Sequence, residues 1–515
     1  MDYTPTNSVW EITYACNMRC KHCGSSCGTK YPDELSLEEA LKLCDDLAEL
    51  GMKVVTLSGG EPFMHPHWDK LARRLTDNGV TVNAISNGWF IDEELIKKAK
   101  AAGIVNIGVS LDGMKATHDF IRREGAYDHV MSALDNMNAH GMPKVICTSV
   151  NKRNFPELRQ MKELLYEKKV ERWQFQIASP MGNLLDHPEL LCGMDDADRL
   201  IDFSYEVMQD DKLTVDLADD LGYFNIKENE IRKKSFNVDG AMTMWSGCQA
   251  GKCVMGIRAN GDISGCLSIR DDNFIEGNIR ERSVIDIWKD EKSFSWNRGL
   301  TKDKLTGFCG KCQYANYCLG GCTGLKLTFS GSIYDNKYCS FRLAIEEEEK
   351  KINQIKKFDK LLESGRKAIA EEEYQIAELY LSRALMLQPE HMEVLSHLGF
   401  VNYFLENFKA CQVYNVKALQ LDPQNAYAHK GLGLCLAAMG DMRDGESHLR
   451  KAIQFTGKDF MDPYFDLAIV LDRDNRPEEA LEILKEGRAK SEKFTADSEE
   501  LYKALRDKLA AVKQG

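Results

Sequence analysis

The chain has 515 residues, a hydrophobic fraction of 43% and a formal net charge of -13 at pH 7. That length indicates about three domains, and the excess of acidic groups argues against a nucleic acid or an anionic membrane as a partner. The first residues lack the basic start and apolar run of a secretory signal, and no stretch reaches the ~18 apolar residues of a membrane span. We therefore expect a cytoplasmic protein without a membrane partner.

The 17 cysteines are too many for ordinary core packing, and most of them fall into two groups. Four lie between residues 16 and 27, and eight lie between residues 248 and 339. In a long chain without an export signal, grouped cysteines indicate metal ligands rather than disulfides.

Residues 1–215 alternate strand-like with helix-like segments. The expected strands are 9–13, 54–58, 80–86, 105–111, 144–150 and 172–178, and the expected helices are 36–50, 68–78, 93–102, 127–140 and 156–168. Such alternation predicts a parallel sheet with outer helices, and six units of this kind fit an α/β partial (β/α)6 barrel. Active sites of barrel folds lie at the C-terminal ends of the strands.

The loop after the first strand holds Cys16, Cys20 and Cys23 in a C-x3-C-x2-C spacing. A four-iron cluster normally takes four protein ligands, so three thiolates leave one iron open, much as a catalytic zinc keeps one open position. An open iron can bind a small molecule and pass it an electron. The alternatives are a zinc knuckle or three unrelated thiols. Cys27 is expected to be a bystander, because a fourth ligand would close the open iron.

The loop after the second strand contains Gly59, Gly60, Glu61 and Pro62. Two glycines allow close approach of the backbone to a ligand, and the carboxylate of Glu61 can accept a charge-assisted hydrogen bond from an ammonium group. By itself, the same tetrapeptide is also compatible with an ordinary turn.

The cysteine spacing followed by this loop resembles the signature of the radical S-adenosylmethionine (SAM) enzymes. The resemblance implies that Cys16, Cys20 and Cys23 hold a [4Fe-4S] cluster whose open iron chelates the amino and carboxylate groups of SAM. It also implies that residues 59–62 hold the SAM amino group. His22 takes a position that is usually aromatic in the family, where we expect its backbone to contact adenine.

Polar residues also follow the third and fourth strands, and they resemble the family's ribose- and carboxylate-contacting positions. Arg122 suits a bidentate grip on the methionine carboxylate. The alternative is that all are turn residues or solvated helix residues. Asn151 and Met181–Gly182, after the fifth and sixth strands, are weaker candidates that touch adenine or only turn the chain. The SAM contacts expected from this part of the resemblance are Ser86, Asn87, Ser110, Asp112 and Arg122.

The second group of cysteines lies in residues 240–342, and its eight thiolates are enough for two fully ligated four-iron clusters or two tetrahedral zinc sites. Together with Gly277–Arg280 and Asp286–Trp288, the pattern resembles the SPASM extension of some radical SAM enzymes, a small cysteine-rich α+β domain. The short step from Cys253 to Gly261 departs from that pattern. The resemblance implies three [4Fe-4S] clusters in all, the first auxiliary one on Cys248, Cys253, Cys266 and Cys322 and the second on Cys309, Cys312, Cys318 and Cys339.

The tail is expected to be entirely helical. Residues 343–363 read as one charged linker helix, supported by i,i+4 pairs of opposite charge. Small residues then recur every 34 positions, as at Gly365, Gly399 and Gly433. This period resembles tetratricopeptide repeats over residues 364–491, a solenoid of helix pairs, followed by a capping helix at 492–515. Such a solenoid binds a partner or peptide, or serves as a structural extension or dimerisation arm.

The resemblance implies an oxidoreductase that cleaves SAM to a 5′-deoxyadenosyl radical, with electrons from a flavodoxin- or ferredoxin-like donor. The expected substrate is a peptide or protein, with a thioether or carbon–carbon crosslink formed in a ribosomally made precursor. We expect the repeat tail to capture it, because the first strand begins near residue 9 and leaves no leader-binding domain before it.

Other readings stay open. Sulfatase maturation is one, although Leu267 and Ser268 follow Cys266 where such relatives have an acidic residue. A radical enzyme acting on a small metabolite is another. A non-catalytic cluster or zinc protein that serves as an interaction scaffold is the third.

Overall fold

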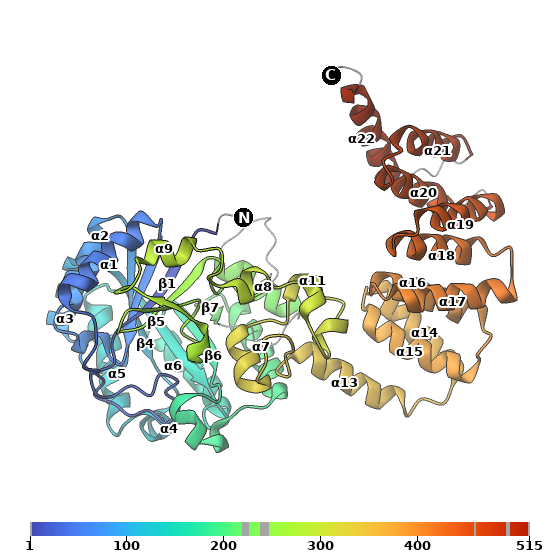
Figure 1. Cartoon of the computed structure of the whole chain (residues 1–515). Helices are drawn as coiled ribbons and strands as arrows, with labels where there is room; N and C mark the ends of the chain where they lie inside the picture. The colour runs from blue at the N-terminus through green and yellow to red at the C-terminus, as the bar shows by residue number, and fades with distance from the viewer. Residues whose placement is uncertain (1–2, 219–225, 237–246, 458–459, 491–494, 513–515) are drawn as a thin grey trace. The chain divides into compact units, whose positions relative to one another are not determined.

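Strand β1 carries the cysteine loop and lies inside a sheet whose described strands follow the order β10-β9-β8-β1-β2-β3-β4-β5-β6-β7. Figure 1 shows this sheet, with β1 and β4 to β7 labelled. The computed structural model describes residues 3–218, 226–236, 247–457, 460–490 and 495–512. Neighbouring strands from β8 through β1 to β7 are parallel, whereas β8, β9 and β10 pair in antiparallel fashion. The strands are β1 (Asn7–Thr13), β2 (Val54–Gly59), β3 (Thr81–Ser86), β4 (Ile104–Ser110), β5 (Lys144–Val150), β6 (Arg172–Ile177), β7 (Thr214–Leu217), β8 (Val254–Ile257), β9 (Asp262–Ser264) and β10 (Ile275–Asn278).

The predicted partial barrel is confirmed, and all six predicted strands occur within two residues of their expected ends. The outer helices bury an apolar stripe against the sheet, as α1 does with Leu43 and Leu47 after a capping box formed by Ser36 and Glu39. Helices α4, α7 and α8 were not predicted. The helices of this part are α1 (Leu37–Glu49), α2 (Trp68–Asp77), α3 (Glu93–Ala101), α4 (Lys115–Ile121), α5 (Ala126–Ala139), α6 (Leu158–Glu167), α7 (Met194–Gln209) and α8 (Ile226–Phe236).

The cysteine-rich region continues the barrel's sheet through β8, which pairs with β1 from Asn7 to Trp10. The N-terminal residues hold it further, because the Trp288 indole donates to the carbonyl of Tyr3 at 2.7 Å. The region is α+β, as expected, and shares one compact unit with the barrel, residues 1–343. Its short helices are α9 (Val284–Lys289), α10 (Ser295–Arg298), α11 (Ala315–Cys318) and α12 (Thr323–Leu325), with a π-helix over Lys326–Ser330.

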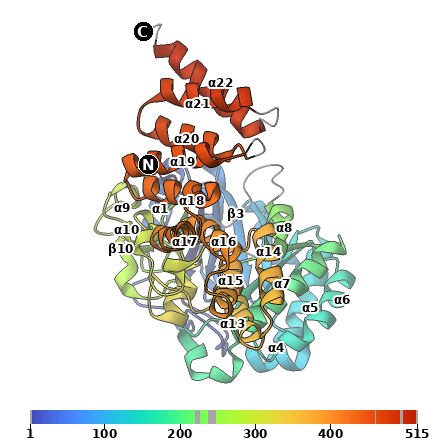
Figure 2. The ribbon, with the colours of Figure 1, turned by 90° about the vertical axis from the view of Figure 1, so that its right-hand side faces the viewer.

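The second compact unit, residues 344–515, is all-helical in its described part (Figure 2). The single helix predicted over 343–363 is wrong: α13 (Ser340–Ile352) ends before that range does, and α14 (Phe358–Ala370) begins a separate helix. Ile352 and Ile355 anchor the segment between the two helices, because both side chains pack into the core formed by α14 and α15. The other helices are α15 (Tyr374–Leu387), α16 (Met392–Phe404), α17 (Phe408–Leu421), α18 (Ala426–Ala438), α19 (Met442–Phe455), α20 (Asp462–Arg473), α21 (Pro477–Lys490) and α22 (Ala496–Val512).

The 34-residue period has a direct packing cause. A Cβ added at Gly365 would meet the side chain of Leu381 at 2.7 Å, and one at Gly399 would meet Asn415 at the same distance. The first helix of each pair therefore needs a position without a side chain where the second helix crosses it. Whether these helix pairs bind a partner stays a prediction.

Candidate active site

The loop of the three cysteines folds back on itself after β1. The amide of Cys16 donates to the carbonyl of Gly28, and the amide of Gly28 donates to the carbonyl of Tyr14, both at 2.9 Å. Cys16, Cys20 and Cys23 all line a cavity of 210 Å³. The structure therefore brings the three predicted ligands to one enclosed site.

Gly59 and Gly60 let the loop after β2 lie directly against the cysteine loop. A Cβ at Gly59 would lie 2.2 Å from the carbonyl oxygen of Thr13, and one at Gly60 would lie 2.2 Å from that of Ala15. The amide of Gly60 donates to Thr13 O at 2.8 Å. The two glycines were expected to let the backbone approach a ligand. In the structure they let the backbone of this loop approach the backbone of the cysteine loop.

Glu61 lies behind the cavity wall rather than on it. Its carboxylate is fully buried and accepts hydrogen bonds from the Ser86 hydroxyl at 2.9 Å and the Asn87 amide at 2.8 Å. Burial raises the pKa of Glu61 to about 7, although these two donors oppose the shift. Pro62, also buried, begins the 3₁₀ turn Pro62–Met64. Glu61 therefore positions Ser86 and Asn87, which do line the cavity.

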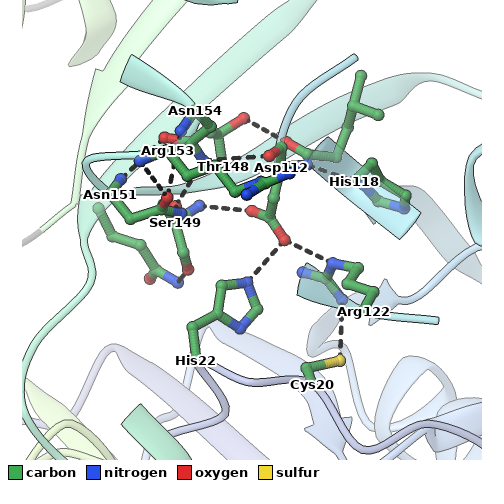
Figure 3. A network of polar contacts seen from close by, with 12 residues as sticks. Cys20, His22, Asp112, His118, Arg122, Thr148, Ser149, Asn151, Arg153 and Asn154 are labelled. Carbon is green, nitrogen blue, oxygen red and sulfur yellow. Dashed lines mark hydrogen bonds and ion pairs between the residues drawn. The ribbon is translucent and has the colours of Figure 1, made fainter. Parts of the chain in front are cut away.

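Asp112 is the centre of a second buried network (Figure 3). Its Oδ2 atom lies 2.5 Å from Nε of Arg122 and 2.7 Å from Nε2 of His22, and its Oδ1 accepts the Ser149 amide at 2.8 Å. Burial alone would raise the pKa of Asp112, but the charges of Arg122 and His22 hold it well below its usual range. The carboxylate is thus a fixed anion that orients two cavity residues.

The guanidinium of Arg122 also reaches the cysteine loop. Its terminal nitrogen NH1 lies 3.9 Å from the sulfur of Cys20 (Figure 3). Because Nε of Arg122 donates to Asp112, that edge of the guanidinium is not free to bind another carboxylate. The expected grip on a carboxylate stays a prediction.

Most residues predicted for this site line the 210 Å³ cavity, and three do not. Glu61, Pro62 and Asp112 lie behind its wall. Asn151 is also buried away from it, where its side chain accepts the amides of Arg153 and Asn154. The predicted residues on the wall are Cys16, Cys20, His22, Cys23, Gly59, Gly60, Ser86, Asn87, Ser110 and Arg122.

The sequence did not point to every residue that lines the smaller cavity. Ser58, Ser149 and Gln176 line the cavity, and their positions at strand ends are the signal that points to them. Cys27 also lines it, and a hydrogen bond from the Cys27 thiol lowers the pKa of Cys23. That Cys27 is a bystander stays a prediction, although the residue touches the site.

A larger cavity of 440 Å³ adjoins the first, and the two share His22, Ser110, Arg122 and Gln176 among their lining residues. Its far wall comes from the cysteine-rich region, through residues 266–268, 270, 324 and 325. Its charged lining residues are Glu11, Arg122 and Arg270, and neutral polar side chains come from Ser149, Gln174, Ser179 and Ser268, among others.

One ion pair joins the barrel to this far wall. Arg270 donates to Glu11 of β1 at 2.7 Å, and Ser25 donates to the same carboxylate at 2.6 Å. Burial alone would raise the pKa of Glu11, but Arg270 lowers it. The cavity between the two regions is therefore held by a buried charge pair.

The cysteines expected to hold the second auxiliary cluster come together. All four line one small enclosed space that is also lined by Phe308, Tyr314 and Phe341. Backbone amides donate to two of their sulfurs, from Asn336 to Cys309 at 3.3 Å and from Tyr314 to Cys312 at 3.4 Å. Donors aimed at sulfur in an apolar surround fit thiolates that hold an iron–sulfur cluster.

The cysteines expected to hold the first auxiliary cluster are less closely gathered. Cys248 and Cys266 pack in one apolar cluster, whereas the thiol of Cys253 donates to the side-chain oxygen of Gln249 at 3.5 Å. The amide of Ser268 donates to the sulfur of Cys266 at 3.4 Å. Within the described part of the chain, no three His, Cys, Asp or Glu side chains converge closely enough to hold a single metal ion.

Comparisons with known proteins agree with this geometry. Residues 10–165 match the Radical SAM superfamily, and residues 248–313 match the SPASM iron–sulfur cluster-binding domain. An AdoMet-dependent heme synthase of Methanosarcina barkeri is 29% identical over 350 residues, 66% of this chain and 98% of that relative. The mycofactocin maturase MftC of Mycobacterium tuberculosis is 29% identical over 335 residues, 64% of this chain and 80% of the relative.

Solved structures share the fold. SuiB of Streptococcus suis bound to S-adenosylmethionine has a TM-score of 0.54 at 17% identity, covering 65% of this chain and 77% of that one. Native anSMEcpe with bound AdoMet has a TM-score of 0.53 at 17% identity, covering 66% of this chain and 96% of that one. Among the described residues, no helix is long and apolar enough to cross a membrane. The chain therefore contains a domain of the radical SAM superfamily over residues 10–165 and an iron–sulfur cluster-binding SPASM domain over residues 248–313, and its relatives make it an enzyme.

Proposed function

We propose that this enzyme oxidises a peptide or protein substrate, forming a thioether or carbon–carbon crosslink in a ribosomally made precursor. The observation that carries the proposal is the pair of adjoining cavities, one at the three cysteines and one between the barrel and the cysteine-rich region. Bound at Cys16, Cys20 and Cys23, a reduced [4Fe-4S] cluster would supply the electron that cleaves SAM to methionine and a 5′-deoxyadenosyl radical.

The residues of the smaller cavity would bind SAM. Ser86, Asn87 and Ser110 offer hydroxyl and amide groups suited to a ribose, and Glu61 fixes the first two in place. Arg122 offers positive charge toward a carboxylate while Asp112 fixes its orientation. The larger cavity would then place a substrate hydrogen next to the SAM ribose and exclude water from it.

The lining of the larger cavity favours a neutral peptide group. Its charged lining residues are all in ion pairs, Arg122 with the buried Asp112 and Arg270 with Glu11, which also lines the cavity. Its other polar side chains are His22 and a set of hydroxyl, amide and thiol groups. Hydroxyls and amides suit a peptide backbone or an uncharged side chain, because both offer donors and acceptors without a net charge. The likeness to a mycofactocin maturase, and to SuiB in its complex with the precursor peptide SuiA, supports this class of substrate.

The eight further cysteines would hold two auxiliary [4Fe-4S] clusters, which makes three clusters in all. Four of these cysteines surround one space with amides aimed at two sulfurs. Such clusters would take up the electron left on the product. A flavodoxin- or ferredoxin-like protein would supply the electron that starts the reaction.

The helix pairs of residues 344–515 would capture the precursor. Tyr427, Lys430 and Phe460 form a cation–aromatic group on α18 and the turn before α20, with Lys430 3.0 Å from Asp462. Aromatic and charged side chains of this kind recognise peptides through both apolar and polar contacts.

A tetrapyrrole is the second candidate substrate, because two kinds of relatives are named heme synthase and Fe-coproporphyrin III synthase. An iron porphyrin would have to place its carboxylates in a cavity whose arginines are already paired. Absorbance titration of the protein with an iron porphyrin decides between the two, since a bound porphyrin shifts its own absorption band and a peptide enzyme gives no shift.

The proposal is tested by measuring 5′-deoxyadenosine in the presence of dithionite, with and without a candidate precursor peptide. We expect the reconstituted protein to form it and the peptide to accelerate its formation. The variant with Cys16, Cys20 and Cys23 changed to Ala should form none. Equal product from that variant would contradict the assignment of the site.

A further inference from the structure

Lys326 is a buried cation without a carboxylate partner among the described residues. In the described part of the chain, two other lysine or arginine side chains that are also buried form ion pairs: Lys144 with Glu171 at 3.0 Å and Arg232 with Glu228 at 2.6 Å. Lys326 is 0% exposed, and its ammonium donates only to the carbonyl of Leu319, at 3.0 Å.

Cysteines of both predicted auxiliary sets lie near this lysine. The amide of Lys326 donates to the carbonyl of Cys322, of the first set, at 3.0 Å, and its ammonium donates to Leu319, the neighbour of Cys318 of the second set. A Cβ at Gly320 would lie 3.4 Å from Lys326 Nζ and 3.8 Å from the sulfur of Cys309. Burial lowers the pKa of Lys326, and negative charge on four thiols opposes that shift. Two of these thiols belong to the first set and two to the second: Cys248, Cys322, Cys309 and Cys318.

A buried ammonium with one neutral acceptor destabilises the fold unless an anion compensates its charge. Among the described residues, no carboxylate forms an ion pair with Lys326. Four thiolates around an iron–sulfur core carry a net negative charge, and two such groups near Lys326 would supply the missing anions.

We propose that Lys326 is a positioning residue whose charge is shared by the two auxiliary clusters and sets their reduction potentials. This inference rests on the proposed assignment of the eight cysteines. A cation in a low-dielectric interior stabilises the more negative, reduced state of each neighbouring cluster. Lys326 therefore makes both clusters better electron acceptors.

The test uses the full chain with Cys16, Cys20 and Cys23 changed to Ala, so that any remaining iron belongs to the auxiliary sites. Lys326→Gln removes the charge but keeps a donor for Leu319 O, and Lys326→Met removes both. The matched control is Lys311→Met, an exposed lysine between Cys309 and Cys312. Midpoint potentials come from redox titration followed by electron paramagnetic resonance.

We expect both Lys326 variants to shift the potentials of both auxiliary clusters to more negative values, and the Lys311 control to leave them unchanged. Unchanged potentials in Lys326→Gln at the parent's iron content would overturn the inference. A shift in Lys326→Met alone would also overturn it, because the lost hydrogen bond and not the charge would then be responsible.

The iron-free proteins give a second readout that does not depend on cluster uptake. Without clusters, Lys326 is an uncompensated buried charge, so iron-free Lys326→Met should unfold at a higher temperature than the iron-free parent. An equal or lower unfolding temperature would count against the inference even if the variants bind no iron. Absence of iron from the parent itself would instead refute the assignment of the eight cysteines, and the inference with it.

Discussion

Asp112 and Arg122 form an ion pair in which Oδ2 lies 2.5 Å from Nε, and the side chains are 0% and 10% exposed. The pair comes from the end of β4 and the end of α4, and it holds Arg122 within reach of Cys20. The guanidinium is thus already held in one orientation before an anionic group binds, which lowers the entropic cost of binding that group.

Arg122→Gln should weaken SAM binding by about tenfold or more, because it removes a charge-assisted contact to the methionine carboxylate. The measurement is equilibrium binding of SAM to the reconstituted protein. The neighbouring Arg123→Gln is the control, since Arg123 is exposed and contacts the carbonyl of Asn17. Equal affinity of the Arg122 variant and the parent would refute the role given to Arg122.

Gly60→Ala should destabilise the barrel by about 1–3 kcal/mol and lower the iron content, because its Cβ would meet a backbone oxygen that no side-chain rotation can move away. Denaturant unfolding and iron analysis check this. Gly457→Ala is the control, because a Cβ there meets no atom within 4 Å. If both variants matched the parent in stability and iron, the packing of the two loops would not depend on Gly60.

Glu61 gives the fold a pH dependence with a definite sign. Its pKa is about 7 in the folded chain against 4.5 as the ordinary value. A carboxyl raised in this way stabilises the fold below its unfolded pKa and loses that contribution as pH rises through the folded value. Glu61→Gln removes the titration. Relative to the parent, the iron-free variant should therefore gain about 2 kcal/mol of unfolding free energy from about pH 5.5 to about pH 8.

Denaturant unfolding of both iron-free proteins at the two pH values measures this difference. The matched control is Glu93→Gln, since Glu93 is exposed and its carboxyl pairs with Lys97 on the surface. A stability difference between Glu61→Gln and the parent that does not change with pH would show that Glu61 does not titrate in this range.

Deletion of residues 358–515 should abolish turnover of the precursor peptide but leave slow SAM cleavage without peptide. The two compact units explain why, since the predicted cluster cysteines and both cavities lie within residues 1–343. The measurement is 5′-deoxyadenosine and modified peptide from the same reaction. Full peptide turnover by the shortened enzyme would rule out capture by the helix pairs.

The barrel was predictable because five of the six predicted strands are followed by a clear helical pattern, so local sequence and fold agree there. Strands β7 to β10 were missed because they have three or four residues, too few for a periodicity to show. The pairing of β8 with β1 joins residues almost 250 positions apart, and no local pattern carries it. The break after Ile352 was missed because charged helix formers continue up to it.

For the site, cysteine spacing and glycine pairs were informative because metal ligation and close backbone contact each demand particular residue types. How deeply a side chain is buried was not predictable. The sequence suggests that Glu61 and Asp112 contact a ligand, yet both are buried behind the cavity wall, where they orient residues that line it. Lys326 could not be singled out either. A lysine's enclosure between cysteines 248, 309, 318 and 322 is visible only after the chain has folded.

The most direct test of the account is the intact mass of a candidate precursor peptide, encoded beside the gene, after co-expression with this enzyme. The control is the same pair with Cys16, Cys20 and Cys23 changed to Ala. The account predicts a loss of about two mass units that depends on the three cysteines, since oxidative crosslinking removes two hydrogens. An unchanged mass, with the peptide confirmed present, would contradict oxidation of that peptide. The result would then favour a tetrapyrrole as the substrate.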